Sequence, residues 1–387
     1  MLELALLRSQ IEEMGEEKIG SEDRLTTSLK RAIRELSTAE TDSLRKRIRM
    51  SKTSWLVAEP LEKLSLTREA PEPPSEFTVV AADGSQIMPS RQEVAYCYLI
   101  NIGSVTIHYG LGRRPVLKSM PSLYYRDEDM HEELDGKETF INEEIVSARR
   151  DLEELDELVR SALSLSGGVN KVVALVDGTL IKWILESYPP DFRDRFLGRF
   201  LQGLDALKEA GIPIAGYISH PGSRDVVNAL KVGLCYMDGA LCARCERNPP
   251  PCAAVDGVSD RMLMSWLLKK EGERSCISGS SAVVLEDYGE HRIFFFYLQT
   301  GGEVARVEVP RWVVEDESML NLVHSVVADQ AKKGGGYPVA LTEAHEKAVV
   351  RGKDRELFFQ IVEEVLIKKG LKTTISVKSM SKRRPTV

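Results

Sequence analysis

Residues 77–85 read Phe-Thr-Val-Val-Ala-Ala-Asp-Gly-Ser, an apolar stretch that ends in an acid and a glycine. Residues 172–178 repeat this arrangement as Val-Val-Ala-Leu-Val-Asp-Gly. Continuous apolar runs of this length are typical of strands that are covered on both faces of a sheet. The two stretches therefore predict two buried strands that carry Asp83 and Asp177 at their carboxyl ends.

The segments around these two strands predict the rest of the sheet. An antiparallel meander comes first, and helices and strands alternate after it. The expected elements are strands at 94–102, 104–109 and 214–219 and helices at about 142–163 and 196–210. This order predicts an α/β fold with an RNase H-like mixed sheet and helices on both faces.

The composition divides the chain into parts. Apolar residues recur at helical spacing over 1–66, which predicts a helical N-terminal extension or dimer element over 1–70. The segment Ala-Pro-Glu-Pro-Pro that begins at Ala70 is an extended linker. The main domain is then expected over 77–370, with a cysteine-containing insertion at 233–290 and a basic C-terminal tail at 371–387.

The overall composition is that of a globular protein. The chain has 387 residues, of which 43% are hydrophobic and 29% charged, and these values exclude wholesale disorder. No stretch approaches the roughly 18 consecutive apolar residues of a membrane span, so we expect a soluble, cytoplasmic protein that does not enter a membrane. The net charge of −7 differs from the basic excess of compact nucleic-acid modules, so DNA contact needs a local basic groove, a dimer groove or a partner.

The two Asp-Gly pairs are candidate metal ligands. Carboxyl ends of neighbouring strands open onto the crevice where α/β sheets bind ligands, and two carboxylates there can share a divalent cation. The alternative is that Asp-Gly only forms a turn after each strand. The segment around Asp177 does not belong to the aspartate-nucleophile phosphatases, because Leu175 occupies the position where they need a nucleophilic carboxylate.

A third candidate element lies near the C-terminus, where Gly-Tyr-Pro at 336–338 precedes Ala344-His345. If Pro338 begins a helix, Tyr337 lies just before it and His345 stands about two turns inside, ~10 Å along the axis. A histidine brought to an acidic crevice is a metal ligand or a proton carrier. The alternative is a surface or capping histidine.

Taken together, these segments resemble the NurA nuclease family in their order and spacing. The resemblance covers about 77–366. Its segments are Ala-Ala-Asp-Gly-Ser at 81–85, Leu-Val-Asp-Gly-Thr-Leu at 175–180 and Gly-Tyr-Pro with Ala-His, together with 217–223, 272–275 and 306–310. It implies an RNase H-like core and a manganese-dependent DNA nuclease, a 5′–3′ exonuclease with single-strand endonuclease activity. It further implies a homodimer that works with a HerA-type hexameric translocase in DNA end resection.

The resemblance also implies the site residues. The catalytic set is Asp83, Glu154, Asp177, Tyr337 and His345, and Asp83, Glu154, Asp177 and His345 bind the metal. The implied cofactor is one or two manganese ions, with magnesium as the alternative. Imidazole suits manganese better than magnesium, which is mostly oxygen-bound.

The helical acid is left open among three glutamates. Arg150 and Glu154 fit the Arg-x-x-x-Glu pattern of the family, and Glu153 is the second choice. The helical period points both away from the apolar stripe that begins at Ala148, whereas Glu144 lies nearer to that stripe.

Four cysteines in the predicted insertion have the spacing C-x6-C-x2-C-x6-C; they are Cys235, Cys242, Cys245 and Cys252. Such a set could hold structural zinc or an iron–sulfur cluster, and the alternative is four unlinked thiols on a loop. The isolated Cys97 and Cys276 are expected to be buried as small apolar residues. A second hypothesis about function follows: a non-catalytic NurA-like adaptor with a cysteine-bound metal that docks on a DNA translocase.

Overall fold

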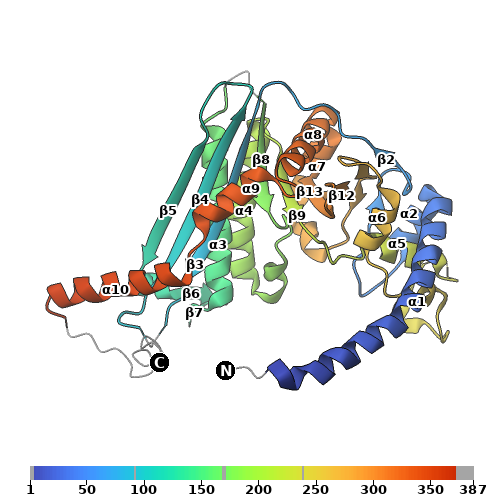
Figure 1. Ribbon diagram of the computed structural model, residues 1–387, viewed down its shortest axis with the longest axis horizontal. Helices are drawn as coiled ribbons and strands as arrows, with labels where there is room; N and C mark the ends of the chain where they lie inside the picture. The colour runs from blue at the N-terminus through green and yellow to red at the C-terminus, as the bar shows by residue number, and fades with distance from the viewer. Residues whose placement is uncertain (1–3, 91–92, 168–170, 238, 372–387) are drawn as a thin grey trace. The chain divides into compact units, whose positions relative to one another are not determined.

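The structure is a computed structural model that describes residues 4–90, 93–167, 171–237 and 239–371 (Figure 1). The chain divides into two compact units, and each unit is built from two separate stretches of sequence. Unit 1 comprises Met1–Glu72 with Tyr217–Gly336, and unit 2 comprises Pro73–Gly216 with Tyr337–Val387.

Unit 2 contains a mixed sheet whose strands follow the spatial order β9–β8–β3–β4–β5. β3 (Phe77–Ile87) pairs antiparallel with β4 (Tyr98–Tyr109), and β4 pairs antiparallel with β5 (Val116–Tyr124). β8 (Lys171–Asp177) pairs parallel with β3, and β9 (Ile214–Ile218) follows it at the boundary of the unit. The predicted order of an antiparallel meander followed by a parallel strand is confirmed.

The first six residues of β3 are all buried, because helices cover both faces of the strand. A Cβ on Gly84 would meet side chains of α3 (Glu143–Leu163), whereas one on Gly103 of β4 would meet the backbone of α9 (Val339–Ala348). Gly103 pairs with Asp83, the residue before Gly84, and successive residues of a strand point to opposite faces. α3 and α9 therefore lie on opposite faces of the sheet, as Figure 1 shows.

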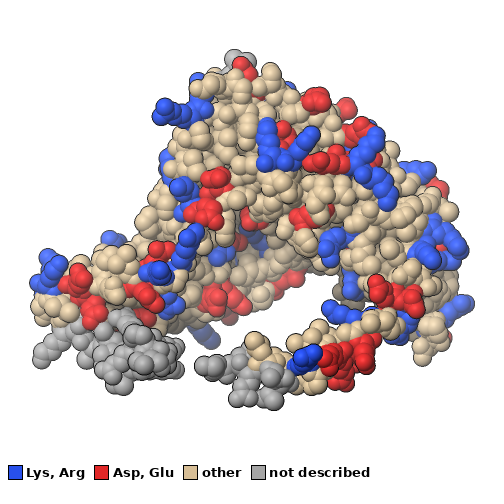
Figure 2. Space-filling view, in the orientation of Figure 1, with Lys and Arg blue, Asp and Glu red and all other residues tan. Residues whose placement is uncertain are grey.

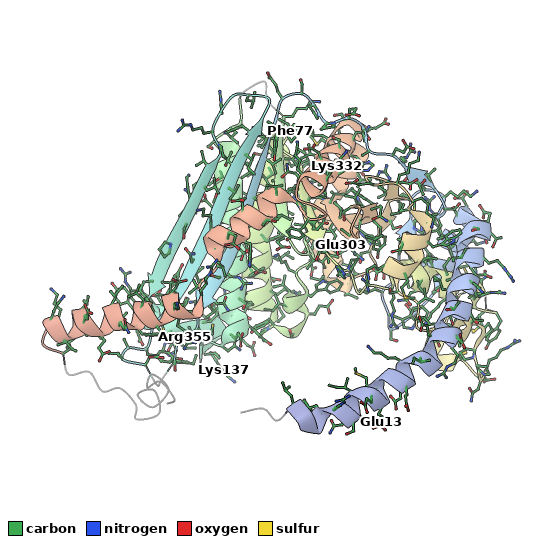
Figure 3. The ribbon with its side chains drawn as sticks, in the orientation of Figure 1. Glu13, Phe77, Lys137, Glu303, Lys332 and Arg355 are labelled. Atoms are coloured by element: carbon green, nitrogen blue, oxygen red, sulfur yellow. The ribbon has the colours of Figure 1, made fainter. Side chains whose placement is uncertain are left out.

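Two details of the predicted meander are wrong. The segments predicted as separate strands at 94–102 and 104–109 form the single strand β4, and the third antiparallel strand is β5, which the sequence analysis missed. β5 is an edge strand with mostly exposed residues, so it needs no apolar run, and it tolerates Pro121. At the start of the sheet, the ring of Phe77 stacks on Tyr109 with 4.6 Å between centroids (Figure 3).

The remaining elements of unit 2 surround this sheet. They are η2 (Asp127–Met130), β6 (His131–Leu134), β7 (Lys137–Phe140), η3 (Trp183–Ser187), α4 (Pro190–Glu209) and α10 (Gly352–Lys368). α4 packs against α3, where the side chain of Leu155 lies against Gly203.

Unit 1 has its own core, in which α1, α2, α5 and α6 pack on a small antiparallel sheet. The strands of this sheet are β1 (Glu59–Pro60), β2 (Thr67–Arg68), β10 (Arg274–Ser275), β11 (Ser278–Gly279), β12 (Ile293–Gln299) and β13 (Val304–Pro310). The helices are η1 (Leu4–Leu7), α1 (Arg8–Thr38), α2 (Thr41–Met50), α5 (Asp225–Leu234), η4 (Cys242–Arg244), η5 (Pro251–Val255), α6 (Asp260–Leu267), η6 (Val283–His291), α7 (Arg311–Glu315) and α8 (Glu317–Lys333).

The helical prediction for the N-terminal extension is correct as far as Met50 and wrong beyond it. The following residues run without a helix, and β1 and β2 pair with β11 and β10. Val57, Ala58 and Leu64 are buried in the core of unit 1, so tertiary packing holds this segment extended. Pro60 could not continue a helix, because it lacks a backbone N–H.

Charged side chains of both signs alternate over the face shown in Figure 2, with acids gathered on the N-terminal half of α1, where Glu13 projects into solvent in Figure 3. Arg113 and Arg114 are exposed basic residues of unit 2. The predicted basic tail lies outside the described residues from residue 372 onward. In the part of the chain that the structure covers, no helix combines the length and apolar character that crossing a membrane requires.

Candidate active site

Asp83 and Asp177 occupy neighbouring positions at the end of a parallel ladder. The last pair of that ladder joins Ala82 of β3 to Val176 of β8, and each aspartate is the next residue on its strand. Burial raises the pKa of Asp177, and the negative charge of Asp83 raises it further. The two carboxylates are therefore close enough to repel each other.

Residues at the start and on the surface of α9 bond to both aspartates. The Nδ1 atom of His345 lies 2.8 Å from Oδ2 of Asp83, and the other carboxylate oxygen of Asp83 accepts the N–H of Gly84 at 2.8 Å. The hydroxyl of Tyr337 donates a hydrogen bond to Asp177, which opposes the rise in the pKa of that carboxyl. The helix begins after Pro338, so Tyr337 and His345 have the positions relative to it that the sequence analysis expected.

The close approach of α9 to the sheet depends on β4. Gly103 has no side chain, and a Cβ there would lie 2.3 Å from the carbonyl oxygen of Ala344. At the end of the helix, Nδ2 of Asn101 donates to the carbonyls of Ala348 at 2.7 Å and of Lys347 at 3.1 Å. These contacts fix the height at which α9 holds His345 above Asp83.

Glu154 reaches the same strand from the opposite face. Its Oε1 atom lies 2.4 Å from the position that a Cβ of Gly84 would take, so only glycine leaves room for this carboxyl. Arg150, one turn earlier on α3, forms an ion pair with Glu154 at 2.9 Å between Nε and Oε1. The glutamate therefore lies beside the residue that follows Asp83.

Two other charged residues surround this ion pair. Asp151 lies 3.3 Å from Arg150 and 3.2 Å from Nζ of Lys182, which is only 10% exposed. Burial raises the pKa of Glu154 to about 8; the charges of Asp151 and Asp83 add to this rise, and Arg150 and Lys182 oppose it. The sequence analysis did not identify Asp151 or Lys182, since neither stands in a recognisable motif.

The structure distinguishes the three helical glutamates by their neighbours. Glu153 accepts a hydrogen bond from Tyr124 on β5, and Glu144 accepts one from Tyr188 at 3.0 Å while remaining exposed. Of the three, Glu154 alone contacts the strand that carries Asp83. The helical period favoured Glu144 because the apolar stripe was assumed to face the sheet, whereas Leu155 of that stripe packs against α4.

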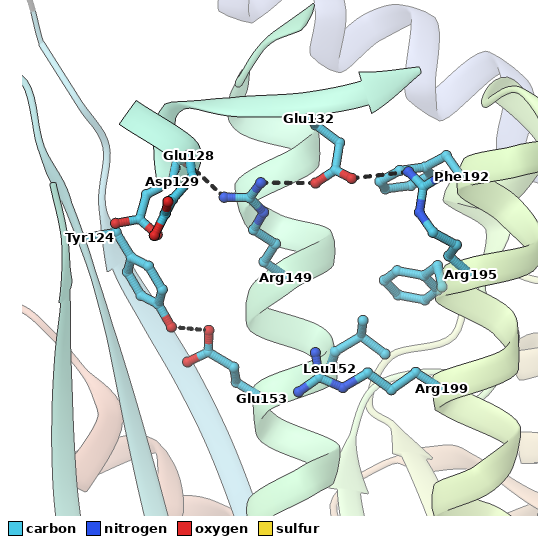
Figure 4. A pocket seen from close by; sticks show the side chains of 11 residues that line it. Tyr124, Glu128, Asp129, Glu132, Arg149, Leu152, Glu153, Phe192, Arg195 and Arg199 are labelled. Atoms are coloured by element: carbon cyan, nitrogen blue, oxygen red, sulfur yellow. Dashed lines mark hydrogen bonds and ion pairs between the residues drawn. The ribbon is translucent and has the colours of Figure 1, made fainter. Parts of the chain in front are cut away.

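Glu153 belongs to a separate pocket of about 490 Å³ between α3, α4 and the end of β5 (Figure 4). Inside it, Arg149 pairs with Glu132 at 2.8 Å, and Glu132 also pairs with Arg195 at 3.1 Å. Arg199, at the pocket's other end, pairs with Asp156. Each of these arginines is matched by an acid, so the pocket offers no unbalanced positive charge to an anionic ligand.

The donor atoms around Asp83 are of the kinds that a divalent cation accepts, and among the described residues no three of them lie within 4.8 Å of one another, so a cation would have to draw them together. They are carboxylate oxygens and the nitrogens of one imidazole, the ligands that manganese accepts, and oxygen ligands also suit magnesium. The charge of Asp83 raises the pKa of both Asp177 and Glu154, so the site has an excess of negative charge that a cation would offset.

A known protein family matches most of the chain. Residues 77–350 match the family model described as the NurA domain, and the chain belongs to the NurA family. Membership of this family supports a nuclease. No curated protein matches the chain.

Three solved structures resemble the chain. The NurA nuclease from Sulfolobus solfataricus is 13% identical, with a TM-score of 0.50 over 95% of this chain and 98% of that one. A second NurA structure is 11% identical, with a TM-score of 0.40 over 76% and 90%. A type 1 RNase H is 16% identical, with a TM-score of 0.22 over 41% and 71%. The first of these shows a shared fold, and the predicted α/β class is confirmed.

Proposed function

We propose that this chain is a manganese-dependent DNA nuclease, a 5′–3′ exonuclease with single-strand endonuclease activity that acts in DNA end resection. The observation that supports this most directly is the placement of Asp83 and Asp177 side by side just after the last pair of the parallel β3–β8 ladder, each hydrogen-bonded from the α9 segment. Two neighbouring carboxylates in a crevice are suited to hold the cation that phosphodiester hydrolysis needs.

The side chains have distinct roles in this proposal. Asp83, Glu154, Asp177 and His345 hold one or two manganese ions, with magnesium as the alternative. Held by these residues, a divalent cation would supply the activation of water and the neutralisation of negative charge on the phosphate that hydrolysis needs. Tyr337 orients the carboxylate of Asp177 through its hydroxyl, and His345 orients Asp83. Arg150 balances the charge of Glu154.

The surface charge bears on how DNA reaches this site. The net charge is −7, and acids and bases alternate over the face in Figure 2, so the protein does not attract DNA through a large uniform field. A homodimer groove, or the pore of a HerA-type hexameric translocase, would feed the strand to the site in the cytoplasm. Any metal that the four cysteines of unit 1 hold is separate from the active-site cation.

The proposal is tested with end-labelled single- and double-stranded DNA. We expect cleavage with manganese, less with magnesium and none with EDTA, with release of labelled 5′ ends before 3′ ends, and faster cleavage when a HerA-type translocase is added. Absence of cleavage under all of these conditions would favour the non-catalytic adaptor.

Replacing Gly103 with alanine should reduce cleavage by about tenfold or more. The new Cβ would lie 2.3 Å from the carbonyl oxygen of Ala344 and 2.4 Å from the amide nitrogen of Ala348, so the backbone of α9 must move and carry His345 with it. A displacement of about 1 Å in a catalytic group can cost ~100-fold in rate. Cleavage rate and thermal unfolding are the measurements.

Gly198→Ala is the matched control, because a Cβ at Gly198 in α4 has nothing within 4 Å. Alanine favours a helix over glycine by up to about 1 kcal/mol, so this variant should cleave normally and unfold at an equal or higher temperature. If Gly103→Ala cleaves DNA as fast as the wild type, the close approach of α9 to the sheet is not needed for cleavage.

Manganese binding should release close to one proton at pH 7 and only about one-tenth of a proton at pH 9. The pKa of Glu154 is raised to about 8, so this carboxyl is mostly protonated at pH 7 and must ionise to bind a cation. The apparent affinity should therefore rise with pH up to about 8 and then level off. Calorimetry in buffers of different ionisation enthalpy measures the released proton.

Glu154→Gln should remove this release, whereas Glu153→Gln should retain it. Burial also raises the pKa of Glu153, but its carboxyl accepts from Tyr124 in the separate pocket. If the proton release disappears in Glu153→Gln and persists in Glu154→Gln, Glu153 binds the metal and the role proposed for Glu154 is wrong.

A further inference from the structure

Four cysteines of unit 1, distant from the residues of the candidate active site in sequence, come together in one loop region. Cys235 directly follows α5, Cys242 begins η4, Cys245 follows η4, and Cys252 lies in η5, which packs against α5. The packing of η5 on α5 brings the segment that contains Cys252 against the helix that Cys235 follows.

The central pair of this set has the geometry of a short turn. The N–H of Cys245 points to the carbonyl of Cys242 at 3.4 Å, which closes one turn of 3-10 helix. A C-x2-C pair on such a turn presents both sulfur atoms to the same side, as metal sites with four cysteine ligands require. Cys235 and Cys252 approach from the two ends of the segment.

The loop has few other means of holding its shape. Between the end of α5 and the start of α6, the described residues contain the short turns η4 and η5 and an isolated β-bridge between Leu241 and Lys52. Arg47 of α2 donates to the carbonyls of Gly233 at 3.0 Å and Met237 at 2.8 Å, and the N–H of Lys52 donates to Ala240 at 2.8 Å. These contacts fix the beginning of the loop and leave Cys245 exposed.

The loop nevertheless covers the core of unit 1. Ala240, Val255 and Val258 are buried in that core, and the side chains of Cys235 and Cys242 pack against it. A segment without regular hydrogen bonding that must cover apolar residues gains stability from a cross-link. None of the six cysteines forms a disulfide.

We propose that Cys235, Cys242, Cys245 and Cys252 bind one zinc ion as a structural site. Four thiolates satisfy the tetrahedral preference of zinc, and the C-x2-C pair supplies two of them from one turn. In the described loop, no three of the sulfur atoms lie within 4.8 Å of one another, so zinc binding draws the loop together and couples metal binding to its folding.

The charge around the loop is compatible with this site. Four thiolates around Zn²⁺ carry a net charge of −2, and a nearby cation offsets part of it. Lys231 of α5, the helix that Cys235 follows, supplies such a cation. Lys231 also lies over the ring of Trp55 at 5.8 Å and pairs with Asp256 at 2.6 Å, which holds the ammonium group at the loop.

Elemental analysis of the full-length protein, purified without chelators, tests the proposal. We expect about one zinc per chain in the wild type, less than roughly a tenth in Cys242→Ser, and about one in the control Cys97→Ala, whose thiol is buried in unit 2. Zinc below a tenth of an equivalent in the wild type would overturn the proposal, and so would iron with the visible absorption of an iron–sulfur cluster.

A second measurement on the wild type covers the case in which Cys242→Ser does not fold. A thiol reagent should modify four more cysteines after zinc is removed by a chelator than before, because Cys97 and Cys276 are buried and burial raises the pKa of Cys276 to about 12. The melting temperature should fall by roughly 5 °C or more with the chelator. Equal thiol counts before and after chelation would contradict the site, whatever the nuclease assay gives.

Discussion

Asp177→Asn is expected to lower the rate of manganese-dependent DNA cleavage by about a thousandfold or more. The carboxylate of Asp177 stands next to Asp83 at the end of the β3–β8 ladder, and an amide there removes one of the charges that hold the cation. Loss of several kcal/mol of transition-state stabilisation corresponds to this factor. Asp83→Asn should have an equal effect, since it also removes the carboxylate that His345 contacts.

Asp177→Asn should leave the fold intact or make it more stable. Burial and the charge of Asp83 raise the pKa of Asp177, so its ionised form is unfavourable in the folded protein without a metal. Removing that charge relieves the repulsion, and the metal-free variant should unfold at an equal or higher temperature than the wild type. A large fall in the unfolding temperature would mean that lost folding explains the lost activity.

Asp194→Asn provides the control for both aspartates. Asp194 lies on α4 with 72% of its side chain exposed, so replacing its carboxylate with the asparagine amide should leave the cleavage rate and the unfolding temperature unchanged. If Asp177→Asn and Asp83→Asn cleave as fast as Asp194→Asn, these two carboxylates do not form the catalytic centre.

Arg306→Met is expected to lower the free energy of unfolding by about 3–5 kcal/mol. Arg306 is buried in unit 1, where it pairs with Asp225 at 2.9 Å and with Glu308 at 3.0 Å and lies over the ring of Phe295. Methionine has a similar volume but removes the guanidinium that both buried carboxylates contact. The measurement is urea unfolding of the metal-loaded protein.

The effect of Arg306→Met should depend on pH. The nearby Asp260 is fully buried, and burial and the charge of Asp225 raise its pKa to about 6. A carboxyl with a raised pKa contributes stability below its unfolded pKa, near 4, and loses this contribution as the pH rises through about 6. Without the arginine, ionised carboxyls become more costly, so the deficit should be larger at pH 8 than at pH 5.

Lys332→Met is the matched control in the same unit. Lys332 is exposed on α8, and its replacement should change the free energy of unfolding by no more than about 0.5 kcal/mol. An Arg306→Met variant as stable as Lys332→Met at both pH values would show that the buried ion pairs contribute little.

The sequence was sufficient to predict the core strands because their apolar runs are continuous. Residues 77–82 and 172–175 are buried as expected, and Asp177 ends β8 as predicted, whereas β3 continues past Asp83 to Ile87 through its pairing with β4. The helix after Pro338 was also predicted, because proline marks the start of a helix. Local signals of this kind need no knowledge of distant neighbours.

Elements that depend on tertiary contacts were not predictable in the same way. β5 has mostly exposed side chains and is a strand because it pairs with β4. β1 and β2 are strands because they pair with strands more than 200 residues away in the sequence. The face of α3 that meets the sheet is mixed: Arg150 and Glu154 lie against Gly84, whereas Ile145 and Val146 share an apolar cluster with residues of β4. A helix with two buried sides does not reveal from its periodicity which side meets which neighbour.

The chain leaves each unit and returns to it, so neither unit is a continuous length of sequence. During synthesis, the ribosome delivers Asp83, Glu154 and Asp177 early, and the segment with Tyr337 and His345 emerges only after most of unit 1 has been made. Since domains tend to fold as their residues emerge, the two aspartates are made well before the segment that hydrogen-bonds to them. A protein shortened before residue 337 would keep its acidic strands and lack the helix that joins them.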